Sequence, residues 1–561
     1  MCGIHAVISP SSCSLPEISP ELHQNLVNRG PDYFGQVTRE SSDGRWKLRF
    51  TSTVLALRGD RVTKQPLHDD SGSGGGNVLC WNGEGWKFMG EVIGEHENDG
   101  EVIYRGLKEA RSVEEVMGVW RGVEGPFAFV FYCEALQRVF WGRDRLGRRS
   151  LMVRRLEGGA VVLGSIADGE GKWEEVEADG VYSLGLGDGV ARRHDWVEEG
   201  ENFVSAKFCP GGSLGFIGVF NKALPSPEGE TPLTRASPSV RALKDQLVES
   251  LKLRVLNIPN PPSSGTGKTR VAVLFSGGLD CTVLARLCHD ILEPHQEIDL
   301  LNVGFENPRV GARLKKEANG KEVDLYEACP DRITGRKSFA ELKNVCPGRV
   351  FRFVAVNVPY SKLQAHRQQI ISLIHPHNTV MDLSIACALY FAARGQGSVR
   401  SESPDPDSEP SPVSYTSPAR VLLSGLGADE LFGGYSRHAA AFQQDGYTGL
   451  VKELLRDVSR LAERNLGRDD RVMAHWGKEV RFPFLDERLV KWAIATPAWE
   501  KCDFEREEEK SGVEAAKRVL RLLAMELGME GVAKEKKRAI QFGSRTAKME
   551  SGRDKGTALL S

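Results

Sequence analysis

Residues 271–280 read Val-Ala-Val-Leu-Phe-Ser-Gly-Gly-Leu-Asp, an apolar run that ends in a glycine-rich turn. A short apolar run bounded by such a turn is typical of a strand buried on both faces of a sheet. A helix is predicted next, because apolar side chains recur at helical spacing, at Val283, Leu284, Leu287, Ile291 and Leu292. Backbone N–H groups of the turn and the helix N-terminus can hold a phosphate chain. The stretch therefore predicts an α/β domain whose phosphate-binding loop comprises Ser276, Gly277, Gly278, Leu279 and Asp280.

The same alternation continues on both sides of this stretch. Helices are predicted at 240–251, 362–373 and 382–393, and strands at 300–305, 351–358 and 420–423. Strands that alternate with helices favour a doubly wound parallel sheet with helices on both faces. Residues 264–269 superficially resemble a Walker A loop, but Pro262 stands where the first glycine belongs, so we assign them no role.

The N-terminal half has a different pattern. Many short β-candidates lie before about residue 190, and only two helical stretches, 20–28 and 101–110, interrupt them. Sheets covered by helices suit this pattern. Residues 201–238 are rich in Gly, Pro and Ser and read as a linker between domains at 2–200 and 239–561. Residues 396–417 contain repeated Ser-Pro and Asp-Pro and few apolar side chains, so we expect a disordered insertion there.

Composition limits the partners and the compartment. With 74 basic and 76 acidic side chains the net charge is −2, which indicates no general polyanion binding, so nucleic acid is not expected. The apolar runs are too short to span a bilayer and no secretory signal is visible, so we expect a cytoplasmic protein without membrane contact. Eleven cysteines without Cys-x-x-Cys pairs favour reduced thiols over a disulfide framework or a zinc site. A homodimer is left open.

Cys2 is the sharpest single candidate for catalysis. Removal of Met1 would leave a thiol and a free α-amino group on one residue, and an amine with a pKa of ~8 can serve as a local base. On position alone, an incidental small residue is the better interpretation. The motifs that follow Cys2 favour the catalytic interpretation instead. In chain order they are 29–32 (Arg-Gly-Pro-Asp), Arg58, 65–67 (Gln-Pro-Leu), 82–84 (Asn-Gly-Glu) and 98–100 (Asn-Asp-Gly).

This series resembles the class II amidotransferases, the N-terminal-nucleophile (Ntn) glutaminases, and implies an αββα sandwich. The resemblance implies that Cys2 attacks the glutamine amide. It also implies that the Asn82 amide and the Gly83 N–H stabilise the oxyanion. It further implies that Arg58 pairs with the glutamine carboxylate, and that Asp99 and Glu84 receive its ammonium group. Taken singly, Arg58 and Asp99 would read as solvated loop charges.

The C-terminal half resembles the asparagine synthetases. The loop at 276–280 is similar to the pyrophosphate loop (PP-loop) of enzymes that cut ATP between its α and β phosphates, although Cys281 stands where most members have Ser. The run at 423–435 and the signature at 479–486 extend the likeness. The resemblance implies that Asp280 and Asp429 hold Mg²⁺ on the phosphates, where the alternative is a helix cap or turn. It also implies adenosine contacts, which are assigned to Leu274, Val303, Ser424 and Gly425.

Two positions depart from the synthetase pattern. Leu426 stands where those enzymes carry an acidic residue that helps to bind or activate the reacting carboxylate and ammonia, and leucine can do neither. An ungapped match also puts Ala539 at a catalytic lysine, for which Lys536, Lys537 or Arg538 are the nearby substitutes. A solvated basic surface is the alternative for that cluster. Phrases such as 330–336 and 539–545 are most similar to the eukaryotic branch called asparagine synthetase domain-containing protein.

The sequence therefore predicts a glutamine-hydrolysing asparagine synthetase that uses glutamine, ATP and aspartate, with Mg²⁺ as the cofactor. Two alternatives stay open. One is an amidotransferase that acts on another carboxylate, because Leu426 changes the region that binds the carboxylate acceptor and leaves the ATP-binding motifs intact. The other is a regulatory protein that binds glutamine or ATP without synthesis.

Overall fold

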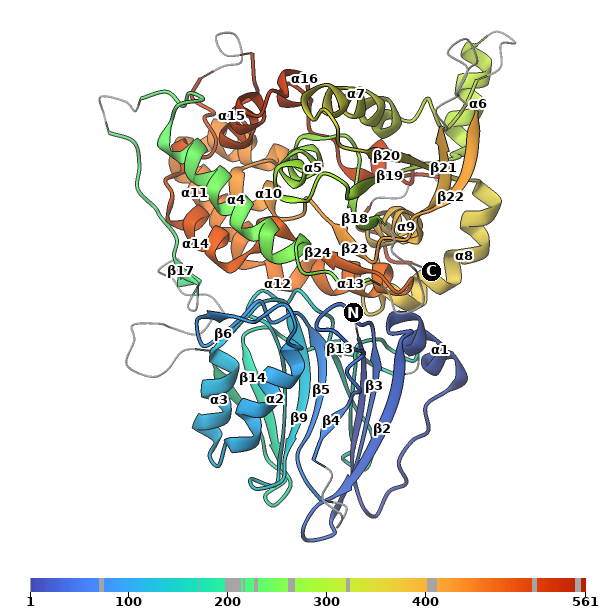
Figure 1. The fold of residues 1–561 in the computed structure, drawn as a ribbon, viewed down its shortest axis with the longest axis vertical. Helices are drawn as coiled ribbons and strands as arrows, with labels where there is room; N and C mark the ends of the chain where they lie inside the picture. The colour runs from blue at the N-terminus through green and yellow to red at the C-terminus, as the bar shows by residue number, and fades with distance from the viewer. Residues whose placement is uncertain are drawn as a thin grey trace.

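A computed structural model describes residues 2–69, 75–169, 171–196, 213–214, 217–226, 231–260, 268–318, 323–400, 411–506, 512–549 and 556–560. The described chain forms two layered bodies, with the N-terminal half drawn below the C-terminal half in Figure 1. Part of the predicted linker, at residues 201–212, 215–216 and 227–230, and residues 401–410 lie outside the described residues. The limits at 200 and 238 therefore stay predictions.

Two six-stranded antiparallel sheets stack face to face in the N-terminal half. The strands of the first sheet, in spatial order, are β13 (Glu174–Glu175), β11 (Met152–Arg155), β12 (Val161–Gly164), β1 (Gly3–Pro10), β3 (Trp46–Val54) and β2 (Tyr33–Glu40). Those of the second are β15 (Ala191–Asp195), β14 (Gly180–Gly185), β10 (Arg138–Arg143), β9 (Phe127–Cys133), β5 (Val78–Gly83) and β4 (Leu67–His68). A three-stranded sheet of β7 (Glu91–Val92), β6 (Lys87–Phe88) and β8 (Val123–Glu124) completes this half. A separate hairpin of β16 (Ser213–Leu214) and β17 (Gly218–Val219) follows in the chain, and β17 packs against α14 (Glu487–Ala495) of the C-terminal half.

Side chains alternate between the two faces of each sheet. One face packs against the other sheet, and the opposite face packs against helices. Phe50 of the first sheet and Val130 of the second lie in the core between the sheets. Trp81 and Phe129 point to the opposite face of the second sheet, where they pack against α2 (Asp99–Glu109) and α3 (Val113–Arg121). Helix α1 (Pro20–Arg29) covers β1 and β3. The predicted αββα sandwich is confirmed.

A seven-stranded sheet organises the C-terminal half. Its spatial order is β22 (Pro412–Thr416), β21 (Gln396–Arg400), β20 (Phe351–Val358), β19 (Glu297–Phe305), β18 (Thr269–Leu274), β23 (Val421–Leu423) and β24 (Glu479–Arg481). The five strands from β20 to β24 in this order are parallel. This confirms the predicted doubly wound sheet. The strand order reverses between β18 and β23, and ligands bind at such a switch point in open α/β sheets.

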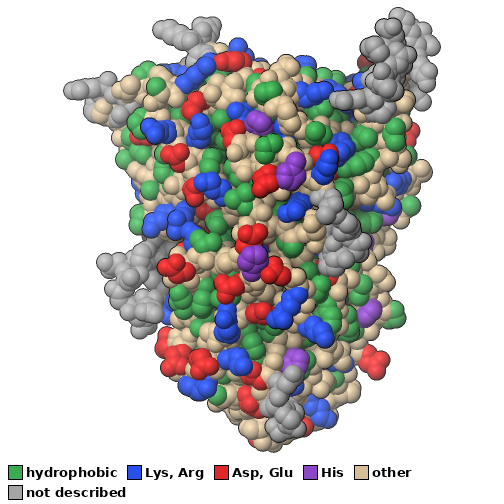
Figure 2. Space-filling view, in the orientation of Figure 1, with side chains coloured by type: hydrophobic (Ala, Val, Ile, Leu, Met, Phe, Trp, Pro, Cys, Tyr) green, Lys and Arg blue, Asp and Glu red, His purple; other side chains and the backbone are tan. Residues whose placement is uncertain are grey.

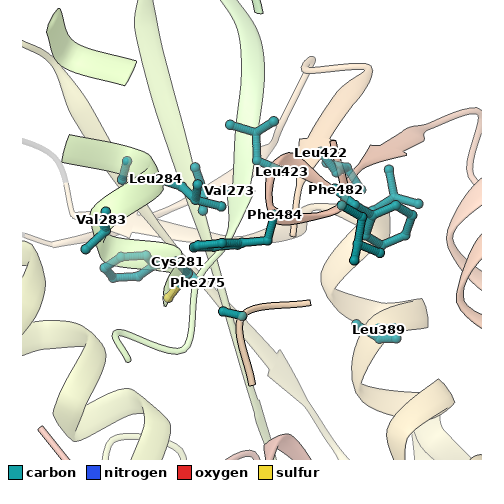
Figure 3. Packing of buried hydrophobic residues seen from close by; sticks show 14 of the residues in the cluster. Val273, Phe275, Cys281, Val283, Leu284, Leu389, Leu422, Leu423, Phe482 and Phe484 are labelled. Carbon is teal, nitrogen blue, oxygen red and sulfur yellow. The ribbon is translucent and has the colours of Figure 1, made fainter. Parts of the chain in front are cut away.

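Helices surround this sheet in Figure 1. Their bounds are α4 (Pro238–Val255), α5 (Leu279–Ile291), α6 (Pro308–Glu317), α7 (Pro330–Val345), α8 (Tyr360–Ile374), α9 (Val380–Arg394), α10 (Ala428–Phe432), α11 (Ser436–Ser459), α12 (Leu461–Arg464), α13 (Leu466–Ala474), α14 (Glu487–Ala495), α15 (Arg518–Glu526), α16 (Glu530–Ala533) and α17 (Ile540–Gly543). Figure 3 shows the core beside the switch point, where Val273 and Phe275 lie near Val283 and Leu284 of α5.

The prediction of a disordered insertion at 396–417 was wrong at both of its ends. Strands β21 and β22 form an antiparallel hairpin that joins the sheet beside β20. The hairpin is held by a buried polar group: the Tyr415 hydroxyl donates to Asp299 at 2.9 Å, and Arg352 donates to the same carboxylate at 3.0 Å. This anchor supplies stabilisation that the weakly apolar sequence of the insertion does not reveal.

Buried ion pairs join the two halves. Arg29 of α1 donates to Asp470 of α13 at 2.8 Å, and Arg420 donates to both oxygens of Asp32 at 2.7 and 2.8 Å. On the face that Figure 2 shows, basic and acidic side chains are interspersed, as the small net charge predicts. Among the described helices, none has both the length and the apolar character needed to cross a membrane.

Candidate functional site

Cys2 lies immediately before β1, a central strand of the first sheet, and is almost completely buried. Burial raises the pKa of its thiol. The Gln65 side-chain amide lies with Nε2 3.8 Å from Cys2 Sγ, while its Oε1 accepts from the Trp81 N–H at 2.9 Å. Gln65 thereby connects the thiol to the end of β5, where the predicted oxyanion donors are located.

Asn82 at that end of β5 is fully buried, yet neither atom of its side-chain amide has a hydrogen-bond partner among the described residues. Buried polar atoms are normally paired, so this unpartnered amide is a candidate donor and acceptor for a ligand. Gly83 is tightly enclosed, because a Cβ there would lie 2.5 Å from the Pro126 carbonyl oxygen. The structure thus places the predicted pair on the strand that Gln65 links to Cys2.

Three buried charges gather near this strand end. Arg58 Nε lies 3.7 Å from Glu84 Oε2. Asp99 accepts from the Gly85 N–H at 2.7 Å and from the Trp81 indole at 3.1 Å. Burial raises the pKa of Asp99, although the Arg58 guanidinium partly opposes this effect. The residues predicted to hold the two charged ends of glutamine therefore lie together, and they are not solvated loop charges.

Glu84 also has a partner that sequence reasoning missed. Arg481 of β24 places Nη2 3.0 Å from Glu84 Oε1, and its Nε donates to Glu479 at 2.6 Å. Burial and the nearby Glu479 raise the pKa of Glu84 to about 8, against the opposing charges of Arg481 and Arg58. A strand of the C-terminal sheet therefore supplies a charge to the N-terminal site.

The predicted phosphate loop follows β18 directly, and α5 begins at Leu279 with Gly278 as its N-cap. Gly277 has a φ of +82°, and a Cβ there would lie 2.4 Å from the Gly335 Cα. Glycine is needed at this position for both reasons. Gly277 thus lets the loop pack closely against α7.

The second loop meets the first across the switch point. Ser424 and Gly425 follow β23, and a Cβ on Gly425 would lie 2.8 Å from the Asp280 Cβ. Leu274 ends β18, and Val303 lies near the carboxyl end of β19. The predicted adenosine residues consequently share one edge of the sheet.

Asp280 and Asp429 are brought together, as predicted, through a shared lysine. Lys517 Nζ lies 2.8 Å from each oxygen of Asp280 and 3.0 Å from Asp429 Oδ1. Lys537 Nζ adds a contact of 2.9 Å to Asp429 Oδ2. Despite burial, the two ammonium groups lower the pKa of Asp429 to about 2.

The chemistry of this carboxylate pair fits Mg²⁺. That cation is commonly held by one or two carboxylates plus substrate phosphates. The described residues contain no group of three or more His, Cys, Asp or Glu side chains that could hold a metal, so phosphate oxygens would have to complete the shell.

The structure distinguishes the lysine candidates. Lys537 reaches Asp429, whereas the Arg538 guanidinium lies 3.9 Å from Asp331, and Ala539 is the N-cap of α17. Lys517 was missed, because it stands 237 positions from Asp280 with no local motif that points to a site. Leu426 is partly buried against the core, and its N–H donates to Ser424 Oγ at 3.3 Å.

The N-terminal sandwich has the fold of a glutamine amidotransferase domain. The family model "Glutamine amidotransferase domain" matches residues 1–179, and "Asparagine synthase" matches 415–448 and 443–555. The chain belongs to the asparagine synthetase domain-containing proteins, since it is 34% identical to asparagine synthetase domain-containing protein 1 of Gallus gallus over 99% of this chain and 98% of that protein.

Two further comparisons are more distant. The glutamine-hydrolysing asparagine synthetase of Gallus gallus is 25% identical over 89% of this chain and 77% of its own length. Among solved structures, glutamine phosphoribosylpyrophosphate amidotransferase from B. subtilis covers 64% of this chain and 81% of its own, with 13% identity and a TM-score of 0.27.

Proposed function

We propose that the protein is a glutamine-hydrolysing asparagine synthetase. The observation that carries this proposal is β24, which contacts both half-sites. Its Arg481 side chain pairs with Glu84 in the glutaminase half, while the Arg481 carbonyl accepts from the Ser424 N–H at 3.0 Å in the other half. A strand that contacts both half-sites suits a chain whose two sites work together.

In the first half-reaction, the Cys2 thiolate attacks the amide carbon of glutamine. The unpartnered Asn82 amide and the Gly83 N–H would donate to the developing oxyanion, which in general lowers the barrier by several kcal/mol, roughly 3 per donor. Ammonia leaves, and water hydrolyses the thioester to glutamate and regenerates the thiol. Arg58 and Asp99 would hold the carboxylate and ammonium ends of the substrate.

In the second half-reaction, the β-carboxylate of aspartate attacks the α-phosphorus of ATP and displaces pyrophosphate. Ammonia then attacks the acyl-AMP carbon, which yields asparagine and AMP. Mg²⁺, when bound by Asp280 and Asp429, supplies positive charge to the phosphate oxygens. Lys537 would add positive charge beside the leaving pyrophosphate, and the loop at Gly277 would donate main-chain N–H groups.

Leu426 favours a second candidate, an amidotransferase for another carboxylic acid. Its apolar side chain stands where an acid would contact the acceptor, so the pocket offers less for an ammonium-bearing amino acid such as aspartate. A protein that only binds glutamine or ATP is the remaining alternative.

The test measures pyrophosphate release by the full-length protein with ATP, Mg²⁺ and aspartate, supplied with glutamine or with ammonium chloride. Asparagine is identified by mass spectrometry. Cys2→Ala should abolish only the glutamine-driven reaction, and Cys13→Ala, which alters a partly exposed thiol of the same half, should change neither. Pyrophosphate without asparagine, from a panel of carboxylic acids, would identify another acceptor. ATP binding without any pyrophosphate would instead support the binding role.

A further inference from the structure

Lys517 has an unusual backbone conformation, and both its main chain and its side chain are held by α10. It is buried, immediately precedes α15, and has a φ of +53°, in the left-handed region that a residue with a Cβ seldom adopts. Its N–H donates to the carbonyl of Phe432, the last residue of α10, at 3.0 Å. Since α10 starts one residue before Asp429, the same short helix positions both Lys517 and its partner. Such local strain persists only where the surroundings fix it.

The four charges at this place balance. Asp280 and Asp429 contribute two negative charges, and Lys517 and Lys537 contribute two positive ones. Lys517 makes the larger share of contacts, since it touches both carboxylates whereas Lys537 touches Asp429. Two buried carboxylates that contact the same ammonium group would repel each other strongly if that cation were removed.

Burial alone does not produce this arrangement. Lys501 is equally buried and donates through Nζ to the Ala493 carbonyl at 2.7 Å. No carboxylate among the described residues forms an ion pair with Lys501, and burial lowers its pKa to about 8. At Lys517 the two carboxylates overcome burial and raise the pKa. Lys501 is therefore a matched control: a buried lysine with a structural contact only.

We propose that Lys517 couples the binding of the divalent cation to the binding of ATP. Its ammonium group and Mg²⁺ bind the same carboxylate oxygens, so Lys517 opposes the binding of Mg²⁺ alone. Phosphate oxygens of ATP, when bound at the neighbouring loop, would offer the ammonium group a second set of anionic partners. Once Lys517 contacts them, the oxygens of Asp280 and Asp429 that it now holds would be released for Mg²⁺. This inference rests on the proposed function in placing ATP at the Ser276 to Asp280 loop.

The coupling predicts opposite effects in one variant. Lys517→Met removes the competing charge, so Mg²⁺ alone should bind about tenfold more tightly. The same variant should bind Mg²⁺ together with an ATP analogue about tenfold more weakly, because a charged phosphate contact is lost. A residue that merely supports the fold would weaken both. Lys517→Arg should remain near wild type in the first measurement.

The experiment titrates full-length protein with Mg²⁺ by calorimetry, alone and with α,β-methylene ATP, which cannot be cut between the α and β phosphates. Lys517→Gln provides a second neutral variant if the Met variant does not fold, and Lys501→Met should change neither affinity. Unchanged or weaker binding of Mg²⁺ alone in both neutral Lys517 variants would overturn the inference. Neither titration needs an acceptor or turnover, so a failure to detect asparagine synthesis leaves this result independent. If the analogue binds to no form of the protein, the proposed function is what fails.

Discussion

At the scale of single residues, Asn82 and Asn302 form an instructive pair. Both are fully buried, but Asn82 has no partner for its side chain, whereas Asn302 donates to Phe275 and Asp331 and accepts from Arg332. A polar group without partners adds nothing to stability and is available to a ligand.

We expect Asn82→Ala to lower glutamine hydrolysis by roughly 10²–10³-fold, the typical effect of losing one oxyanion donor, with little change in Tm. Ammonia-driven pyrophosphate release should be unaffected. Glutamate production and thermal melts check this. In the control, Asn302→Ala should cost about 1–3 kcal/mol of stability because it leaves buried partners unpaired. A large fall in Tm for Asn82→Ala would show that its role is structural.

The sequence alone selected the residues around Cys2 and Asp280, which the fold brings together, because they lie in short motifs with a fixed order. It could not choose between Lys536, Lys537 and Arg538, since neighbouring residues in a loop differ in direction, and only the fold shows that Lys537 meets Asp429. Lys517 and Arg481 reach their partners across 237 and 397 positions respectively. No local pattern carries information about contacts of that kind.

At the scale of elements, the parallel strands were predictable and the β21–β22 hairpin was not. Continuous apolar runs such as 271–275 signal a buried strand on their own. The hairpin depends instead on Asp299, whose pKa is raised by burial while hydrogen bonds that include Tyr415 oppose the change. Its strand residues are largely exposed, so they lack the apolar alternation that marks a strand.

Tyr415→Phe should loosen this hairpin. Loss of the hydroxyl leaves one oxygen of the buried Asp299 carboxylate without that donor, which costs about 1–3 kcal/mol. We expect faster amide hydrogen exchange at 396–400 and 412–416, with unchanged pyrophosphate release. Tyr326→Phe is the control, because its hydroxyl has no hydrogen-bond partner among the described residues. Equal exchange in the two variants would contradict the proposed anchor.

At the scale of the whole molecule, Arg148 fastens the N-terminal sandwich to the other half. It donates to Asp144 within its own half, and to Glu487 and the Leu485 carbonyl across the interface. Burial opposes ionisation of Glu487, but Arg148 more than offsets this and lowers the pKa of Glu487 to about 2. The ordinary value is 4.5, so the stabilisation is complete above that pH and is lost as the pH falls towards 2.

Glu487→Gln should therefore cost about 3 kcal/mol near neutral pH, at the low end for a broken buried pair because Asp144 remains. The difference in Tm from wild type should shrink as the pH falls below about 4. Calorimetry at neutral and acidic pH measures both. Glu526→Gln removes a half-exposed partner of Lys244 and should change stability by less than about 1 kcal/mol. A Tm difference that is independent of pH would contradict the ionic explanation.

The contact of β24 with the N-terminal half limits how the two halves can be exchanged between related proteins. Residues 2–200 transplanted into another scaffold would arrive without the guanidinium of Arg481 that faces Glu84. Glu84 would then keep Arg58, at 3.7 Å, as its one cationic neighbour among the described residues, in a buried site where two guanidinium groups normally face it. A functional exchange between relatives must carry a three-residue strand from a distant part of the chain along with the sandwich. If Glu84 serves the proposed glutamine site, recombination that separates the N-terminal half from β24 should weaken glutamine hydrolysis.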